Sequence, residues 1–321
     1  MLNKTEKKIV YLDSETLRYM YYSYTDERSY PVMKKLYSLL HEGYVNNWLV
    51  TPLSNDHILP YIRENSIEPH FFSMMGGIGQ VQYFQRFTVK TLQLIRVLNN
   101  VFGNEYEKPP WRDVFTGDPD EKTTTGFNRY TSINSLNVIQ TNSREKIYSH
   151  VHEFIEGYKT GTPIEKLAQL HFKTIWEQFP DFMKHHLPRV GAAETHRNIF
   201  LANEDLKDIP EFHILFSLLY SLFQASGIAS VEQGARDEEL LTAEIMSSYL
   251  PYCHYFVTKI SIAELAVTLG IDVFYNVRVY EHNESSLFRL IDEIKEDRKT
   301  AQKEQSMSGQ RTIFQKGGTK R

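Results

Sequence analysis

Ile9-Val10-Tyr11-Leu12-Asp13 is the stretch that decides the fold, because a short continuous apolar run is typical of a strand covered on both faces. Ser14 then begins an expected helix, for which it is the predicted N-cap. The pattern next predicts a helix over 31–41 that ends before Gly43, a strand over 48–50 and a helix over 55–63. This alternation predicts the beginning of a parallel α/β sheet.

The same alternation returns near the end of the chain. The expected elements are a helix over 237–249, a strand over 254–258, a helix over 260–269 that ends at Gly270, an edge strand over 276–280 and a closing helix over 285–295. Two strands alone make a marginal sheet. We therefore expect both ends of the chain to contribute to one parallel sheet flanked by helices.

The middle of the chain has helical periodicity and polar loops, and no convincing parallel strand between about residues 66 and 227. The expected organisation is a first α/β part over 1–66, a large α-helical insertion over 67–227 and a second α/β part of the same sheet over 228–297. The remaining residues, 298–321, are rich in Gln, Ser, Gly and Lys. They predict a disordered basic tail, with a nucleic-acid-contacting arm as the alternative.

Charge is distributed unevenly along the 321 residues, of which 41% are hydrophobic and 24% charged. The formal net charge is −4, but residues 298–321 carry +6 and the remainder −10. An acidic body argues against broad nonspecific binding of duplex nucleic acid, which depends on neutralising phosphates. It leaves room for a local nucleic-acid groove or for a carboxylate cluster that holds a metal ion.

Cysteine usage and hydropathy indicate the compartment. Cys253 is the single cysteine, so no intramolecular disulfide can form, which favours a reducing environment. No apolar run approaches the roughly 20 residues that a membrane span requires, and the first residues contain no apolar signal region. We expect a cytoplasmic protein without a membrane partner.

Asp13 is the most informative single residue, because ligands of parallel α/β sheets bind beyond the carboxyl ends of the strands. An aspartate directly after the first strand is a candidate for a catalytic or metal-binding role. The same position also suits an aspartate that caps a helix or is simply solvated. The residues alone leave both interpretations open.

Three segments, taken together and in this order, resemble PIN-like nuclease domains. They are Ile9 to Ser14 (IVYLDS), Trp48 to His57 with its Pro52-Leu53-Ser54 run, and Ser248 to Thr258 (SYLPYC followed by FVT). The likeness is to a bacterial branch in which an LPYC-type stretch precedes the late strand. It covers about residues 7–63 and 228–293 and implies a PIN-like α/β fold, with the helical insertion unmatched.

The resemblance also implies a metal site, because PIN-like nucleases gather three or four carboxylates at the strand ends. Hard divalent cations take oxygen ligands, and hydrolysis of a phosphodiester needs an activated water and charge neutralisation. Carried over to this chain, the catalytic acids are Asp13, Glu239 and Glu244, and the implied cofactor is Mg²⁺ or Mn²⁺. The run 237–239 equally suits a solvated first helical turn, where the helix dipole favours acids.

Two positions depart from the family pattern. Pro60 occupies the place of the acid after the second strand, and Glu64, one helical turn further on, is the candidate substitute as a metal ligand. Lys259 follows the late-strand threonine where the family has aspartate, and an ammonium there would repel a cation or pair with Asp13. We assign His57 and Lys259 as candidate substrate-binding residues.

Two functions therefore remain open. The first is a metal-dependent nuclease acting on RNA or single-stranded nucleic acid. The second is a catalytically inactive PIN-like module that binds RNA, or a protein partner through its helical insertion. Asp13 favours the first function, whereas Lys259 and Pro60 favour the second.

Overall fold

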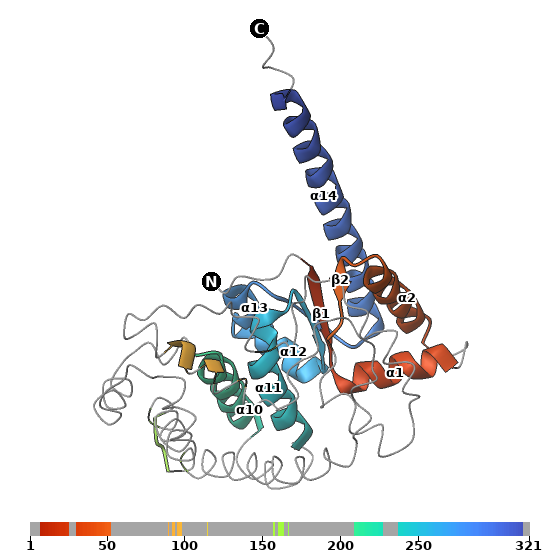
Figure 1. The fold of residues 1–321 in the computed structure, drawn as a ribbon. Helices are drawn as coiled ribbons and strands as arrows, with labels where there is room; N and C mark the ends of the chain where they lie inside the picture. Colours follow the sequence, from red (N-terminus) through yellow and green to blue (C-terminus); the bar gives the residue numbers. More distant parts are fainter. Residues whose placement is uncertain are drawn as a thin grey trace, which may run out of the picture.

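The computed structural model describes residues 7–25, 30–52, 209–226 and 237–316, together with isolated residues between 89 and 166. Its sheet consists of β1 (Lys8–Leu12), β2 (Leu49–Val50), β3 (Tyr255–Thr258) and β4 (Arg278–Glu281). The strand order is β2-β1-β3-β4 and every pairing is parallel (Figure 1). The prediction of one parallel α/β sheet built from both ends of the chain is confirmed.

Helices cover both faces of this sheet. One face packs against α1 (Ser14–Thr25), α2 (Pro31–Val45) and α14 (Glu284–Lys316). The opposite face packs against the π-helix η4 (Glu211–Phe216), α10 (Ser217–Ser226), α11 (Asp237–Tyr249) and α12 (Ile260–Thr268). The 3₁₀-helix η6 (Leu250–Tyr252) leads into β3, and α13 (Ile271–Tyr275) precedes β4.

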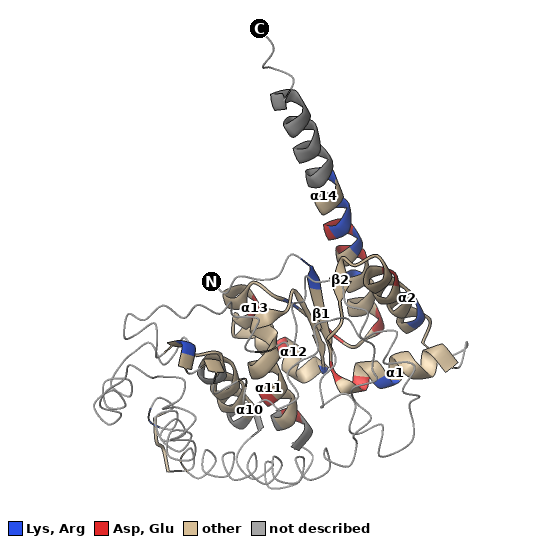
Figure 2. Ribbon diagram, in the orientation of Figure 1, with Lys and Arg blue, Asp and Glu red and all other residues tan. Residues whose placement is uncertain are grey.

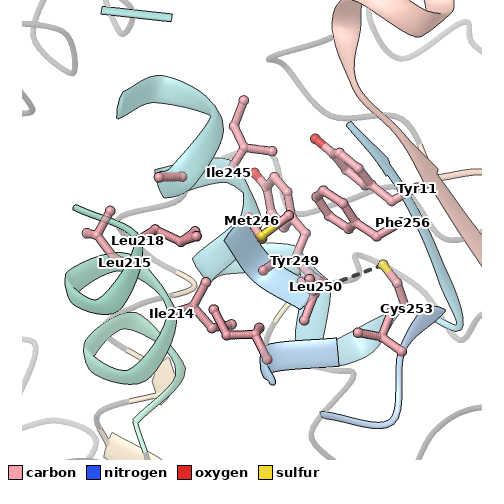
Figure 3. Packing of buried hydrophobic residues seen from close by; sticks show 14 of the residues in the cluster. Tyr11, Ile214, Leu215, Leu218, Ile245, Met246, Tyr249, Leu250, Cys253 and Phe256 are labelled. Atoms are coloured by element: carbon pink, nitrogen blue, oxygen red, sulfur yellow. Dashed lines mark hydrogen bonds between the residues drawn. The ribbon is translucent and has the colours of Figure 1, made fainter. Parts of the chain in front are cut away.

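The alternation of side chains along β1 explains this three-layer arrangement. Val10 and Leu12 belong to the apolar cluster under α1, α2 and α14, whereas Ile9 and Tyr11 belong to the cluster on the other face. All four side chains are fully buried, as expected for a central parallel strand. On the second face, the Tyr11 ring stacks on Phe256 with centroids 4.8 Å apart, close to Tyr249 (Figure 3).

The described end of the helical insertion belongs to this second layer. Ile214, Leu215 and Leu218 pack toward Met246 of α11 (Figure 3). Cys253 is buried and donates a hydrogen bond to the carbonyl of Tyr249. The expected helix over 55–63 and most of the insertion over 67–227 lie outside the described residues. No described helix is long and apolar enough to cross a membrane.

Gly43 corrects one boundary prediction, because it lies inside α2 and does not end the helix. A Cβ atom at this position would lie 2.6 Å from the Cβ of Leu49 on β2. The glycine therefore permits close approach of helix and strand, a long-range requirement that the local sequence does not reveal. Helix α2 continues to Val45, four residues beyond the expected end.

The alanine variant Gly43→Ala should destabilise the protein, although alanine favours a helix over glycine by about 1 kcal/mol. The overpacking against Leu49 costs about 1–3 kcal/mol and outweighs this gain. We expect a net loss of about 1 kcal/mol in urea unfolding. Ser38→Ala, at an exposed position of the same helix, is the control. A Gly43→Ala protein more stable than wild type would contradict the close approach.

The closing helix is longer than predicted, and this corrects the tail boundary. Helix α14 continues from Glu284 to Lys316 and projects beyond the sheet (Figure 1), so the structure has helix over 298–316, where the sequence predicts a tail that follows the closing helix. Lys, Glu, Gln and Ala are good helix formers, which explains the extension. Arg298 belongs to the body: its guanidinium lies 4.9 Å from the Trp48 ring centroid and pairs with Glu42.

Candidate functional site

Asp13 immediately follows β1 and is held at the start of α1. Its backbone N–H donates to the carbonyl of Val257, which continues the β1–β3 ladder by one residue. Its Oδ1 accepts hydrogen bonds from the backbone N–H of Thr16 at 2.8 Å and from the Thr16 hydroxyl at 2.6 Å. Asp13, and not the predicted Ser14, is therefore the N-cap of α1.

Capping accounts for only one of the two carboxylate oxygens. Oδ2 of Asp13 is buried and receives no hydrogen bond from the described residues. Burial raises the pKa of Asp13 above its ordinary value, whereas the Thr16 hydrogen bonds and the charge of His282 oppose the rise. A buried carboxylate oxygen is stabilised by a proton, a cation or an external donor, so Oδ2 is suited to bind a ligand.

The sheet topology places this oxygen where ligands of α/β proteins bind. The connection from β1 leads to β2 on one side, whereas the connection from the adjacent strand β3 leads to β4 on the other side. The carboxyl ends of β1 and β3 thus form a topological switch point, where the diverging connections leave a crevice beyond the strand ends. Asp13 occupies this point.

Each of the other three strands also has, at its end or directly after it, a polar side chain with a buried atom that receives no hydrogen bond from the described residues. Among the described residues, no hydrogen bond reaches the hydroxyl of Thr51 after β2, the hydroxyl of Thr258 at the end of β3 or Nδ1 of His282 after β4. These three residues are not among the site residues predicted from the sequence. The signal that could have found them is their shared position at the carboxyl ends of expected strands.

Charged groups lie beside this row of strand ends. Lys259, the N-cap of α12, forms an ion pair with Glu15 of α1 at 3.8 Å. The Tyr19 hydroxyl donates to the same glutamate at 3.2 Å, and the Tyr19 ring meets His282 edge-on with centroids 6.2 Å apart. The position of Lys259 after the late-strand threonine predicts that its ammonium repels a cation or pairs with Asp13. The structure instead shows an ion pair between Lys259 and the neighbouring Glu15.

The other predicted acids lie on α11 or outside the described residues. Glu239 accepts a hydrogen bond from the Ser261 hydroxyl at 3.0 Å, which ties the start of α11 to the start of α12. Glu244 is buried in the middle of α11. Among the residues that the structure describes, no three His, Cys, Asp or Glu side chains form a group that could hold a metal. Glu64 and His57 lie outside them.

The pKa of Asp13 leads to a test of its burial. A carboxyl whose folded pKa is raised binds its proton more tightly in the native state, so its ionisation destabilises the fold. Ionisation of Asp13 should therefore lower the free energy of unfolding of the wild type as pH rises from about 4 to the raised pKa. Each pH unit within that window costs at most about 1.4 kcal/mol.

The matched variant for this test is Asp13→Asn, because asparagine caps helices as well as aspartate but does not ionise. The difference in stability between wild type and variant, from urea melts at a series of pH values, isolates the contribution of Asp13. We expect the free energy of unfolding of the variant to increase relative to that of the wild type as pH rises. A constant difference across the series would show that the carboxyl ionises without a burial cost.

Comparisons of this chain with protein-family models, with curated proteins and with solved structures found no match. The likeness to PIN-like nucleases therefore depends on the three sequence segments alone. The structure adds a parallel α/β sheet with a buried acid at the switch point.

Proposed function

We propose that this chain is a PIN-like, metal-dependent nuclease that acts on RNA or single-stranded nucleic acid at the carboxyl edge of its sheet. The observation that carries the proposal is the buried Oδ2 of Asp13, which lies at the switch point without a hydrogen-bond donor among the described residues. The sequence resemblance identifies the same residue as the first-strand acid of the family.

The donor types at the strand ends suit a hard divalent cation. Asp13 contributes a carboxylate oxygen, and Thr51 and Thr258 contribute hydroxyl oxygens from the two adjacent strands. Mg²⁺ and Mn²⁺ prefer oxygen ligands, and Mg²⁺ is often held by one or two carboxylates together with the phosphate of a substrate. A bound cation would lower the pKa of its water and neutralise charge on the phosphate.

The remaining predicted residues have supporting roles in this proposal. Glu244 and Glu64 are candidate further metal ligands, and His57 is a candidate contact for the substrate. Glu239 is a weaker candidate than its sequence position implied, because its carboxylate already accepts the Ser261 hydroxyl. Lys259, beside the strand ends, can meet a substrate phosphate once its pairing with Glu15 is exchanged.

The ion pair of Lys259 also favours a second candidate, an inactive PIN-like module that binds RNA or a protein partner. It places an ammonium after β3, where the family has an acid. In an inactive module, Lys259→Asp should create the metal site that the wild type lacks. Thermal melts would then show stabilisation by Mn²⁺ for the variant only, about 2.7 kcal/mol at a hundred times the dissociation constant.

The experiment that tests the proposal uses the full chain with Mn²⁺ or Mg²⁺ and a labelled single-stranded RNA. A nuclease should show metal-dependent thermal stabilisation and metal-dependent cleavage, both removed by excess EDTA. Asp292→Asn, which removes an exposed carboxylate of α14, is the control and should leave both unchanged. If the wild type neither binds metal nor cleaves RNA, the nuclease proposal is wrong.

A further inference from the structure

A cluster of tyrosines covers the helices next to the strand ends. Tyr19, Tyr22 and Tyr24 lie on α1, and Tyr30 lies at the start of α2. These four residues are called the tyrosine surface below. The Tyr19 ring packs on Tyr30 with centroids 5.2 Å apart, and Tyr24 packs on the buried Tyr37 at the same distance. The rings are therefore held in place by neighbouring aromatic side chains.

The tyrosine surface is continuous with the candidate site. Tyr19 is the link, because its hydroxyl donates to Glu15 while its ring meets His282 at the end of β4. Glu15 in turn pairs with Lys259 after β3. A ligand bound on these tyrosines would therefore lie beside the carboxyl edge of the sheet.

Three of the four rings remain partly exposed to solvent despite these aromatic contacts. Tyr22, Tyr24 and Tyr30 are 42%, 41% and 50% exposed. Tyr30 is also the N-cap of α2, with φ of 45° and no hydrogen bond from its side chain. Helix caps favour Ser, Thr, Asp, Asn or Gly, and a left-handed backbone favours Gly or Asn. Neither helix capping nor backbone geometry therefore accounts for a tyrosine at this position.

Basic residues accompany the tyrosines in the sequence, and the stretch 14–38 has a formal net charge of +1, in contrast to the acidic body. It contains the bases Arg18, Arg28, Lys34 and Lys35 and the acids Glu15, Asp26 and Glu27. Burial and Glu15 raise the pKa of Tyr19, and the nearby charge of Arg18 opposes the rise. Figure 2 shows that the C-terminal half of α1, which carries Tyr22 and Tyr24, contains no charged residue. This combination is complementary to a ligand with aromatic groups and negative charges.

We propose that the tyrosine surface binds single-stranded nucleic acid, with unpaired bases stacked on the exposed rings and phosphates near Arg18 and Lys34. Stacking on aromatic side chains is available to every unpaired base, so binding tolerates different sequences. The bases of a duplex are already stacked on one another and cannot use these rings. The surface thereby selects single strands, and it serves catalysis only if the proposed nuclease function holds.

Fluorescence anisotropy of the full chain tests this proposal in EDTA, where cleavage is blocked. The probe is a labelled oligouridine of about a dozen nucleotides, which forms no stable duplex. Tyr30→Ala should weaken its binding roughly 5- to 150-fold, whereas Tyr30→Phe keeps the ring and should bind like wild type. Tyr220→Ala is the control, because Tyr220 is similarly exposed but lies on α10, across the sheet. Thermal melts verify that each variant is folded.

The outcomes separate this inference from the proposed function. Binding that depends on the Tyr30 ring, without cleavage in Mn²⁺, would support the tyrosine surface and contradict the nuclease. Cleavage that depends on Asp13 but not on Tyr30 would support the nuclease and contradict the tyrosine surface. The tyrosine surface is also refuted if Tyr30→Ala and Tyr220→Ala bind alike, if the wild type does not bind oligouridine, or if an RNA duplex competes as well as a single strand.

Discussion

Asp13→Asn should reduce metal-dependent cleavage of single-stranded RNA by about a hundredfold or more while leaving the protein folded. Oδ1 of Asp13 caps α1 through two hydrogen bonds from Thr16, and an asparagine oxygen can accept both. The substitution thus removes the negative charge and spares the cap. Mutation of a group that only orients a metal ligand typically lowers metal affinity or activity about 10- to 100-fold. Removal of the charge of a ligand itself should lower activity at least as much.

Three measurements make this expectation specific to the site. Circular dichroism and a thermal melt should show an intact fold, at least as stable as wild type near neutral pH because a buried charge is removed. Mn²⁺ should no longer stabilise the variant. Cleavage should be normal in Asp292→Asn. Retention of full metal-dependent cleavage by Asp13→Asn would place the catalytic site elsewhere.

Asp297→Ala should give the largest loss of stability among the simple surface variants, about 2–3 kcal/mol. Asp297 on α14 binds the first residues of three strands at the amino edge of the sheet. Its Oδ2 accepts from the Tyr255 hydroxyl at 2.6 Å and lies 3.3 Å from Nζ of Lys8, while Oδ1 lies 3.3 Å from Arg278. Alanine leaves two cations and a tyrosine hydroxyl without this shared acceptor.

The pH dependence of Asp297 has the opposite sign to that of Asp13. Burial would raise the pKa of Asp297, but the Tyr255 hydrogen bond and the charges of Lys8 and Arg278 outweigh it and lower the pKa. The stabilisation is complete above the ordinary pKa of about 4 and is lost as pH falls through the lowered folded value. Urea melts should show the cost of Asp297→Ala at pH 7 and a smaller cost near pH 2.

The control for this variant is Asp292→Ala on the same helix, because Asp292 is exposed. It should change the free energy of unfolding by less than about 0.5 kcal/mol. Equal losses for the two variants would show that the effect arises from α14 itself and not from the cluster at the amino edge. A loss for Asp297→Ala that did not shrink in acid would contradict the lowered pKa.

Local sequence patterns determined much of this fold. The apolar runs Ile9–Leu12 and Tyr255–Val257 predicted buried parallel strands, because residues covered on both faces need no polar alternation. The start of α12 and the turn at Gly270, with φ of +69°, were likewise predictable from nearby residues. Asp13 was recognisable as a candidate site residue, because its position after a strand is a local property.

Only the tertiary structure decided the features that depend on residues far apart in the sequence. Gly43 is needed for the approach of Leu49, and Arg298 belongs to the body through Glu42 and Trp48. The row of unsatisfied polar atoms at Thr51, Asp13, Thr258 and His282 arises from the strand order β2-β1-β3-β4. The order in which strands assemble is set by the packing of whole layers, and no local pattern encodes it.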